Sequence, residues 1–300
     1  MPKKALIMGS TVADIIINLN QLPGTAEDVH VISQRTQLGG CAFNVSDIFR
    51  HADAPHLLFS PVGSGIYGDF VRDEMNRRGI ERVIPDQVEE NGCCYCFVES
   101  GGERTFISHR GAEYRFKTEF FDRIDPSEYG CAYVCGLEIE EPESLSMIHF
   151  LQENPKIRVY FAPGPRIMKL PAERMAALFA MGPVLHLNER EAHEYTGLPM
   201  ESAALWLQHK TGADVVITLG ARGAYCLPEQ GEGQLVPPSS VTVVDTIGAG
   251  DAHIGALMAY RENGRALVEA TSIANRVAGL VVSRRGALID KADFDELKLS

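Results

Sequence analysis

Four short hydrophobic segments recur from residue 131 onward, and each is separated from the next by a stretch with helical character. They occupy residues 131–139, 157–165, 183–189 and 214–220. This alternation of strand and helix predicts a parallel sheet that is covered by helices on both faces. Ligands of such sheets bind at the carboxyl ends of the strands. The residues at these ends are Glu138, Gly164-Pro165-Arg166, Asn188-Glu189-Arg190-Glu191 and Gly220-Ala221-Arg222-Gly223.

The first part of the chain predicts elements of the same kind, followed by a hairpin. Residues 3–10 are typical of a buried strand, and residues 41–52 and 69–80 are typical of amphipathic helices. Two alternating segments flank a glycine pair within residues 92–109, which predicts an antiparallel pair of strands. No long linker or internal repeat divides the 300 residues, so we expect a single α/β domain.

Charge and hydropathy exclude several classes of function. The net charge of -12 argues against a general nucleic-acid-binding protein, since such proteins usually carry a basic face. No run approaches the roughly 18 apolar residues of a membrane span, and the N-terminus lacks the pattern of a signal peptide. We therefore expect a cytoplasmic protein that acts on small molecules and has neither nucleic-acid nor membrane partners.

The seven cysteines do not form a recognisable metal or disulfide framework. Cys93, Cys94 and Cys96 lie together in one predicted strand, and Cys131 and Cys135 lie in another, without the paired spacing of a zinc site. Small, reduced cysteines that pack as hydrophobic strand residues are the simpler interpretation.

A glycine-rich turn with two aspartates lies near residue 250. Asp245 ends a hydrophobic segment, and Gly248-Ala249-Gly250, here called the glycine turn, precedes Asp251 at the start of a predicted helix. Free N–H groups and the helix dipole favour anion binding at such a turn, while Asp251 could take a proton from a substrate hydroxyl. Taken alone, the pattern is equally typical of an aspartate N-cap after an ordinary turn. The chain contains no Walker P-loop motif.

A second glycine pair changes this interpretation. Gly39-Gly40 precedes a predicted helix with Asn44 in its first turn, in the stretch GGCAFNVS. Together, this stretch and DTIGAGD from Asp245 to Asp251 resemble the two signatures of the PfkB (ribokinase-like) family of sugar and nucleoside kinases. The two stretches occur in the order and in the thirds of the chain that the family shows, and the likeness extends over nearly the whole sequence.

The resemblance implies a fold and a reaction. The fold would be a ribokinase-like three-layer α/β sandwich over residues 1–300, with a central, mostly parallel sheet between helices and a small β lid from residues 15–36 and 92–111. The reaction would be transfer of the γ-phosphate of ATP to a hydroxyl of a small sugar or sugar-like substrate. Asp251 would be the base, and the glycine turn would stabilise the charge developed in transfer. The residues that would bind the substrate are Asp14, Gly40, Asn44 and Arg166.

Nucleotide and metal sites are also implied by the resemblance. Asn188 and Glu191 match an N-x-x-E motif, in which the glutamate would act on Mg²⁺ through water, since magnesium often keeps its waters. In some members of the family, the carbonyls of residues matching Asp245 and Ile247 hold a monovalent cation such as K⁺. The remaining residues that would bind the nucleotide are Thr218, Gly220, Gly223 and Asn275.

Several residues depart from the family pattern. Cys41 stands where ribokinases carry a lysine, which puts ribose itself in doubt as the substrate, and Ala162 replaces an aspartate upstream of Arg166. His253 stands where aromatic or apolar residues are common, and we expect it to be packed in the interior. Arg104 and Arg110 lie in or after the predicted hairpin, where most charged side chains are simply solvated.

Other functions remain open on sequence alone. A nucleoside kinase would use the same base and glycine turn, and a phosphofructokinase-like enzyme would need arginines for a substrate phosphate. A non-catalytic regulator on the same scaffold would have no need to keep Asp251 and Glu191, so their presence favours an enzyme. We also expect a homodimer formed through the β lid, because an uncovered sheet edge favours pairing.

Overall fold

The computed structural model describes residues 3–299, which form two separate sheets. The larger has eight strands in the order β12-β11-β10-β9-β8-β7-β1-β4. Its strands are parallel from β4 through β10, and β11 and β12 add an antiparallel edge. The bounds are β1 (Lys4–Met8), β4 (His56–Phe59), β7 (Tyr129–Cys135), β8 (Arg158–Ala162), β9 (Val184–Asn188), β10 (Val215–Thr218), β11 (Ala224–Leu227) and β12 (Gln234–Val236). The four hydrophobic segments after residue 130 are thus confirmed as adjacent parallel strands.

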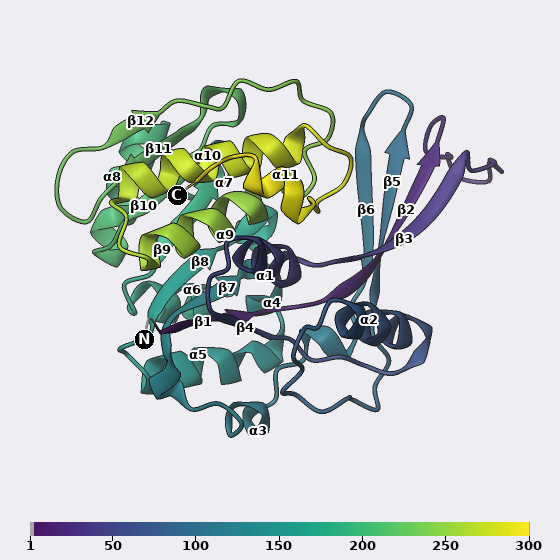
Figure 1. The fold of residues 1–300 in the computed structure, drawn as a ribbon, viewed down its shortest axis with the longest axis horizontal. Helices are drawn as coiled ribbons and strands as arrows, with labels where there is room; N and C mark the ends of the chain where they lie inside the picture. The colour runs from purple at the N-terminus through teal and green to yellow at the C-terminus, as the bar shows by residue number, and fades with distance from the viewer. Residues whose placement is uncertain (1–2, 300) are drawn as a thin grey trace.

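Helices cover both faces of this sheet, as Figure 1 shows. One face packs against α1 (Cys41–His51), α9 (Ala249–Glu262) and α10 (Leu267–Val282), with α11 (Lys291–Asp295) beyond them. The other face packs against α5 (Leu145–Glu153), α6 (Ala172–Phe179), α7 (Glu189–Thr196) and α8 (Met200–Thr211). The shorter helices are α3 (Thr118–Phe121), α4 (Gly136–Ile139), η1 (Ala112–Tyr114), η2 (Pro126–Glu128), η3 (Pro142–Ser144), η4 (Gly164–Lys169) and η5 (Gly220–Arg222).

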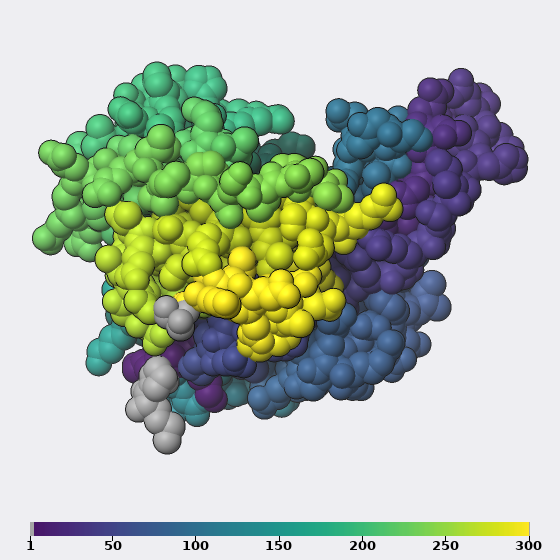
Figure 2. Space-filling model, turned by 45° about the horizontal axis from the view of Figure 1, so that its top comes forward, coloured from purple at the N-terminus to yellow at the C-terminus, as the bar shows by residue number. Residues whose placement is uncertain are grey.

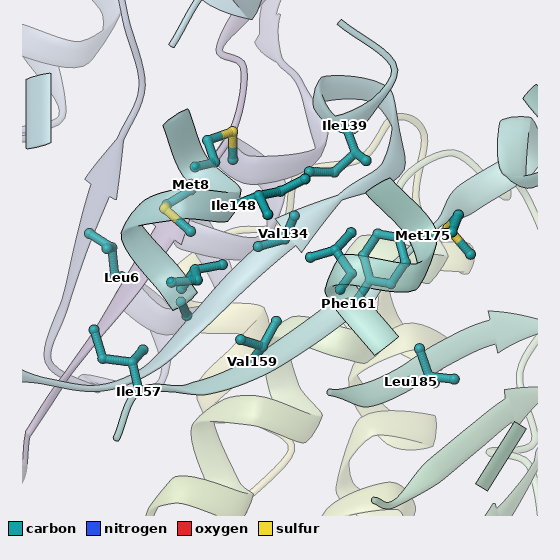
Figure 3. Packing of buried hydrophobic residues seen from close by; sticks show 14 of the residues in the cluster. Leu6, Met8, Val134, Ile139, Ile148, Ile157, Val159, Phe161, Met175 and Leu185 are labelled. Carbon is teal, nitrogen blue, oxygen red and sulfur yellow. The ribbon is translucent and has the colours of Figure 1, made fainter. Parts of the chain in front are cut away.

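The two-residue period of the strands divides the core into two layers. Leu6 and Met8 of β1 belong to one cluster with Val134, Val159 and Phe161 (Figure 3), and this cluster includes the buried residues of α5. Ile7, between them in the sequence, belongs to the opposite cluster, which packs against α1 and α9. Strands buried on both faces explain why their sequences are continuous apolar runs rather than alternating ones.

The smaller sheet has four strands in the order β3-β2-β5-β6. Their bounds are β2 (Val12–Leu19), β3 (Ser33–Gly39), β5 (Cys93–Glu99) and β6 (Arg104–His109). The predicted hairpin is confirmed, because β5 and β6 pair antiparallel. One face of the small sheet packs against α2 (Gly65–Arg77), and the sheet projects from the rounded body of the molecule (Figures 1 and 2).

The described residues contain neither a membrane-spanning helix nor a cluster of metal-ligating side chains. Across residues 3–299, no helix combines the length and the apolar character needed to span a membrane. All seven cysteines are free, and within the same residues no group of three or more His, Cys, Asp or Glu side chains is arranged to hold a metal ion.

Candidate active site

The glycine turn lies at the N-terminus of α9. The N–H groups of Val244 and Asp245 donate to the carbonyl of Val282 at 2.7 and 3.1 Å, which fixes the preceding segment to the end of α10. Gly248 is the N-cap of α9 in the left-handed region, with φ 73°. A Cβ atom at Gly248 would lie 2.5 Å from the Cβ of Ala287, so this close approach requires glycine.

The helix that follows Gly39-Gly40 contacts Asp251, which follows the glycine turn. Gly40 is the N-cap of α1 with φ 105°, and a Cβ atom there would lie 2.4 Å from the carbonyl oxygen of Ser10. This tight passage lets α1 start next to the end of β1 and places Asn44 in its first turn. The Nδ2 of Asn44 donates to Oδ2 of Asp251 at 2.9 Å. The fold therefore joins two motifs that are 207 residues apart in the chain.

Two carboxylates in this region have strongly raised pKa values. Burial raises the pKa of Asp251 to about 6, against the lowering effect of its hydrogen bond with Asn44. Burial, and then the negative charge of Asp251, raise the pKa of Asp14 on β2 to about 7. Gly39 makes room for Asp14, since a Cβ atom at Gly39 would lie 1.9 Å from Oδ2 of that aspartate. A carboxylate with a pKa just below neutral is well suited to accept a proton from a hydroxyl.

Glu138 is a third acidic residue of this region, and its place at a strand end was the only feature that the sequence indicated for it. It lies on α4, directly after β7, and is fully buried. Its Oε1 accepts the N–H of Ser10 at 2.9 Å, and burial raises the pKa of its carboxyl. Oε2 of Glu138 and Oδ1 of Asn44 have no hydrogen-bond partner among the described residues. Buried polar atoms of this kind are costly unless a ligand satisfies them.

Cys41 contributes no charge to the site. The hydrogen bond with Cys135, and then burial, raise the pKa of the Cys41 thiol well above its ordinary value, so the thiol is neutral. Asp251 and Glu138 also influence the pKa of this thiol, which places it among the acidic groups. The cysteine therefore changes the charge of the site relative to a lysine at the same position.

A cavity of about 520 Å³ lies on the other side of the glycine turn. It is lined by α9, α10, the η5 turn and the segment 238–246. Four of the residues expected to bind the nucleotide border it, together with part of the glycine turn: Thr218, Gly220, Gly223, Asn275, Ala249 and Gly250. Its volume lies within the usual range for cofactor-sized ligands.

His253 is buried, as expected, and connects three elements near this cavity. Nδ2 of Asn275 donates to the carbonyls of Val236 and Pro237, which leaves its Oδ1 to accept from Nε2 of His253 at 3.1 Å. Nδ1 of His253 then accepts from Nε2 of His186 at 2.9 Å. Burial lowers the pKa of His253 to about 4 and the pKa of His186 well below its ordinary value, so both rings are neutral. The donor and acceptor roles along this series of hydrogen bonds are therefore fixed.

Asn188 and Glu191 form a capping box at the start of α7. Oδ1 of Asn188 accepts the N–H of Glu191 at 2.8 Å, and Oε2 of Glu191 accepts the N–H of Asn188 at 3.0 Å. Nδ2 of Asn188 also donates to Oε1 of Glu191 at 2.7 Å. Each carboxylate oxygen keeps a free lone pair, which fits contact with Mg²⁺ through water but not a metal cage built by the protein.

Asp245 is held in a different way from the other acidic residues. Its Oδ1 accepts the N–H of Ile247 and its Oδ2 accepts the N–H of Gly286, both at 2.8 Å. Arg104, from β6 of the small sheet, forms an ion pair with Oδ1. The resemblance placed K⁺ on the backbone carbonyls of Asp245 and Ile247, whereas the positive charge that the structure shows at Asp245 is this guanidinium, on the side-chain carboxylate.

Arg110 and Arg166, the other two arginines that the sequence suggested for the site, lie in a separate cluster. Arg166 forms an ion pair with Glu140 through two nitrogens, and Arg110 pairs with both Glu140 and Glu141. Both guanidinium groups are thus already paired with carboxylates. Asp14 and Asn44, by contrast, lie close to Asp251. The structure thus does not bring Arg166 into hydrogen-bond contact with the other residues expected to bind the substrate.

Comparison with known proteins identifies the family of the chain. Residues 2–293 match the model of the pfkB family carbohydrate kinases. The chain is 30% identical over 290 residues to the uncharacterized sugar kinase YegV of Escherichia coli (strain K12), covering 95% of this chain and 90% of that protein.

Solved structures share the fold at lower sequence identity. A ribokinase of Arabidopsis thaliana, complexed with ribose and ATP, aligns with a TM-score of 0.81 at 22% identity, over 100% of this chain and 99% of its own. An adenosine kinase of Sinorhizobium meliloti aligns with a TM-score of 0.85 at 18% identity, over 99% and 100%. The ribokinase-like fold is confirmed, and the chain belongs to the pfkB family of carbohydrate kinases.

Proposed function

We propose that this protein transfers the γ-phosphate of ATP to a hydroxyl of a small, uncharged sugar or sugar-like alcohol. The observation that supports this most strongly is the position of Asp251. It lies in the first turn of α9, paired with Asn44 from the other glycine motif, between a buried polar region and a cavity of about 520 Å³. A base in that place can receive a hydroxyl proton while a nucleotide approaches from the opposite side.

The polar region supports a substrate with several hydroxyl groups. Asp14, Oε2 of Glu138 and Oδ1 of Asn44 are hydrogen-bond acceptors, and the last two have no partner among the described residues. Hydroxyl groups of a sugar would donate to Asp14 and Asp251, which are only partly buried. The neutral thiol of Cys41 provides no positive charge for a phosphorylated substrate, and Arg110 and Arg166 are held by Glu140 and Glu141.

The cavity beyond the glycine turn would hold ATP. Thr218, Gly220 and Gly223 would approach the phosphates and ribose, and Asn275 would lie near the base. The N–H groups of the glycine turn and the dipole of α9 would hold the transferring phosphoryl group. Asn188 and Glu191 would contact Mg²⁺ through water while the ion is bound to the phosphates. The ion would neutralise phosphate charge. The small sheet would act as a lid that excludes water.

A nucleoside kinase is the second candidate, since an adenosine kinase shares the fold. A base-binding site needs an aromatic face that is free to stack. Phe43, Tyr114 and Phe116 are the aromatic residues that the sequence suggested, and all three are buried, with Phe43 and Phe116 in the hydrophobic clusters. This favours a sugar over a nucleoside. We further propose that the enzyme is a cytoplasmic homodimer that pairs through the small sheet.

The test is an ADP-release assay with Mg-ATP and a panel of acceptors, with an inactive variant as control. Fructose, ribose, 2-keto-3-deoxygluconate, adenosine, inosine, cytidine and pseudouridine would be compared for the wild type and Asp251→Asn. We expect turnover with a sugar that the variant does not show. Turnover with nucleosides alone would establish the second candidate, and ATP binding without turnover of any compound in a wider panel would contradict the kinase proposal.

A further inference from the structure

Asp245 has a central place beneath the glycine turn. Its carboxylate accepts hydrogen bonds from the N–H groups of Ile247, directly before the glycine turn, and of Gly286, in the segment after α10. Gly248 itself rests against Ala287 of that same segment. One buried carboxylate, 7% exposed, therefore sets the spacing between the glycine turn and the segment that supports it.

The negative charge of Asp245 is a difficulty for phosphate binding. Two neutral N–H donors do not cancel a buried carboxylate, and this one lies only three residues before the glycine turn. An uncompensated negative charge in that place would repel the phosphates that the turn would hold. The site therefore needs a cation at Asp245.

Arg104 supplies that cation from another part of the chain. It begins β6, directly after the turn that joins β5 and β6, and its guanidinium pairs with Oδ1 of Asp245. The Arg104 side chain is only 17% exposed, and its Nε has no partner among the described residues. Arg35 on β3 approaches the same place, because a Cβ atom at Gly286 would lie 3.5 Å from its Nη2. Two strands of the small sheet thus carry arginines to the segment behind the glycine turn.

We propose that Arg104 is a positioning residue that provides the positive charge at Asp245 and so holds the glycine turn in its phosphate-binding form without a monovalent metal ion. Arg104 belongs to the small sheet, so the position of this sheet against the body also determines the conformation of the glycine turn. This inference rests on the proposed kinase function, and it assigns to the small sheet a role in phosphate binding as well as in covering the substrate.

The experiment compares the wild type, Arg104→Ala, Arg104→Lys and the matched control Arg123→Ala. Arg123 is exposed and forms no ion pair within the described residues. The kcat and the KM for ATP are measured in potassium chloride and in tetramethylammonium chloride at equal ionic strength. A second measurement, the thermal shift caused by a non-hydrolysable ATP analogue in the two salts, requires no acceptor sugar. It therefore tests Arg104 even if the acceptor remains unidentified or the kinase proposal fails.

We expect the wild type and Arg123→Ala to change by less than about twofold between the two salts. Arg104→Ala should lose about tenfold or more in kcat/KM for ATP in tetramethylammonium, because a charged partner is removed from a buried carboxylate. Potassium should restore part of this loss and part of the thermal shift, and Arg104→Lys should restore part of both in either salt.

Three results would overturn the proposal. The first is a wild type that loses about tenfold of its activity or of its analogue affinity when potassium is withdrawn. The second is an Arg104→Ala variant that behaves like Arg123→Ala. The third is an Arg104→Ala variant that melts at a lower temperature but keeps its kcat, its KM for ATP and its salt response, because the ion pair would then only stabilise the fold.

Discussion

At the scale of single residues, Asp251 is the base that we propose, and its surroundings both raise its pKa and orient it. Burial raises the pKa to about 6, and the amide of Asn44 holds Oδ2 at 2.9 Å. The carboxylate is thus ionised at neutral pH, yet it is a better proton acceptor than a solvated aspartate. Asp14 differs from Asp251, since its own pKa of about 7 leaves it partly protonated under the same conditions.

The substitution Asp251→Asn tests this assignment. The amide keeps the shape of the side chain and can still accept the hydrogen bond of Asn44, so the pocket should remain intact while the base is lost. We expect turnover to fall by more than about a thousandfold and the affinity for ATP, measured by calorimetry, to stay within several-fold. Turnover above about a tenth of the wild-type value would show that another group accepts the proton.

The raised pKa of Asp14 predicts how stability changes with pH. The folded protein holds the proton of Asp14 up to about pH 7, whereas the unfolded chain releases it near the ordinary value of 3.8. The contribution of Asp14 to the free energy of unfolding therefore falls as the pH rises through that interval. We expect Asp14→Asn to raise the melting temperature at pH 8 by several degrees more than at pH 4.5, measured by differential scanning fluorimetry.

The control for this experiment is Asp73→Asn, an exposed acidic residue on α2. Its melting temperature should follow that of the wild type at both pH values. An equal gain for Asp14→Asn at pH 4.5 and pH 8 would mean that the substitution acts through packing rather than through titration. Asp14→Asn should also weaken binding of the acceptor sugar, because the amide has one acceptor oxygen fewer.

At the scale of elements, the site depends on two helices that start at glycines. Gly40 has φ 105°, and a Cβ atom there would meet the carbonyl of Ser10 at 2.4 Å, which no side-chain movement can relieve. We expect Gly40→Ala to displace the start of α1, separate Asn44 from Asp251 and lower kcat/KM for the acceptor by at least about a hundredfold. Steady-state kinetics together with far-ultraviolet circular dichroism would show whether the helix is displaced or the protein is unfolded.

Gly79→Ala is the matched control for that substitution. Gly79 also has a positive φ, of 66°, but a Cβ atom there would meet nothing within 4 Å. It should cost about 1 kcal/mol of stability from backbone strain and leave kcat/KM unchanged. Equal losses of activity in the two variants would argue against the close contact with Ser10 as the cause.

The elements also show how far the sequence alone can lead. Apolar runs predicted β7, β8, β9 and β10, because strands buried on both faces have few alternatives, and the glycine turn predicted the start of α9 within a residue. The family resemblance assigned Asn44 to the substrate and Asp251 to proton transfer, but the hydrogen bond between them was not predicted, because periodicity does not indicate which distant segments meet. Glu138 and Arg104 received no specific role, since the burial that makes each of them important exists only in the folded chain.

At the scale of the whole molecule, the small sheet contacts the body in two places. One face packs on α2, whereas Arg104 reaches from its edge strand to the segment behind the glycine turn. Both edge strands, β3 and β6, pair on one side only within the described residues. Such edges can extend into a second copy of the same chain, and exposed apolar side chains beside them increase that tendency.

The proposed dimer leads to a prediction about mass. Ile32, just before β3, is 62% exposed, and Ile107 on β6 is 56% exposed. In a dimer that pairs through the small sheet these side chains would be covered, and a lysine in their place would need its charge removed from water. We expect the wild type to sediment at twice the chain mass of 32.9 kDa, and the double variant Ile32→Lys with Ile107→Lys to sediment as a monomer.

A substitution on a different surface separates this effect from a general response to added charge. Ile66 on α2 is 75% exposed and lies outside the small sheet, so Ile66→Lys should remain dimeric. A wild type that is monomeric at micromolar concentration would contradict the proposed dimer, and a double variant that stays dimeric would place the interface elsewhere. If the monomeric variant also requires potassium for ATP binding, the dimer contributes to seating Arg104 on Asp245, because dimerisation would then hold the small sheet against the body.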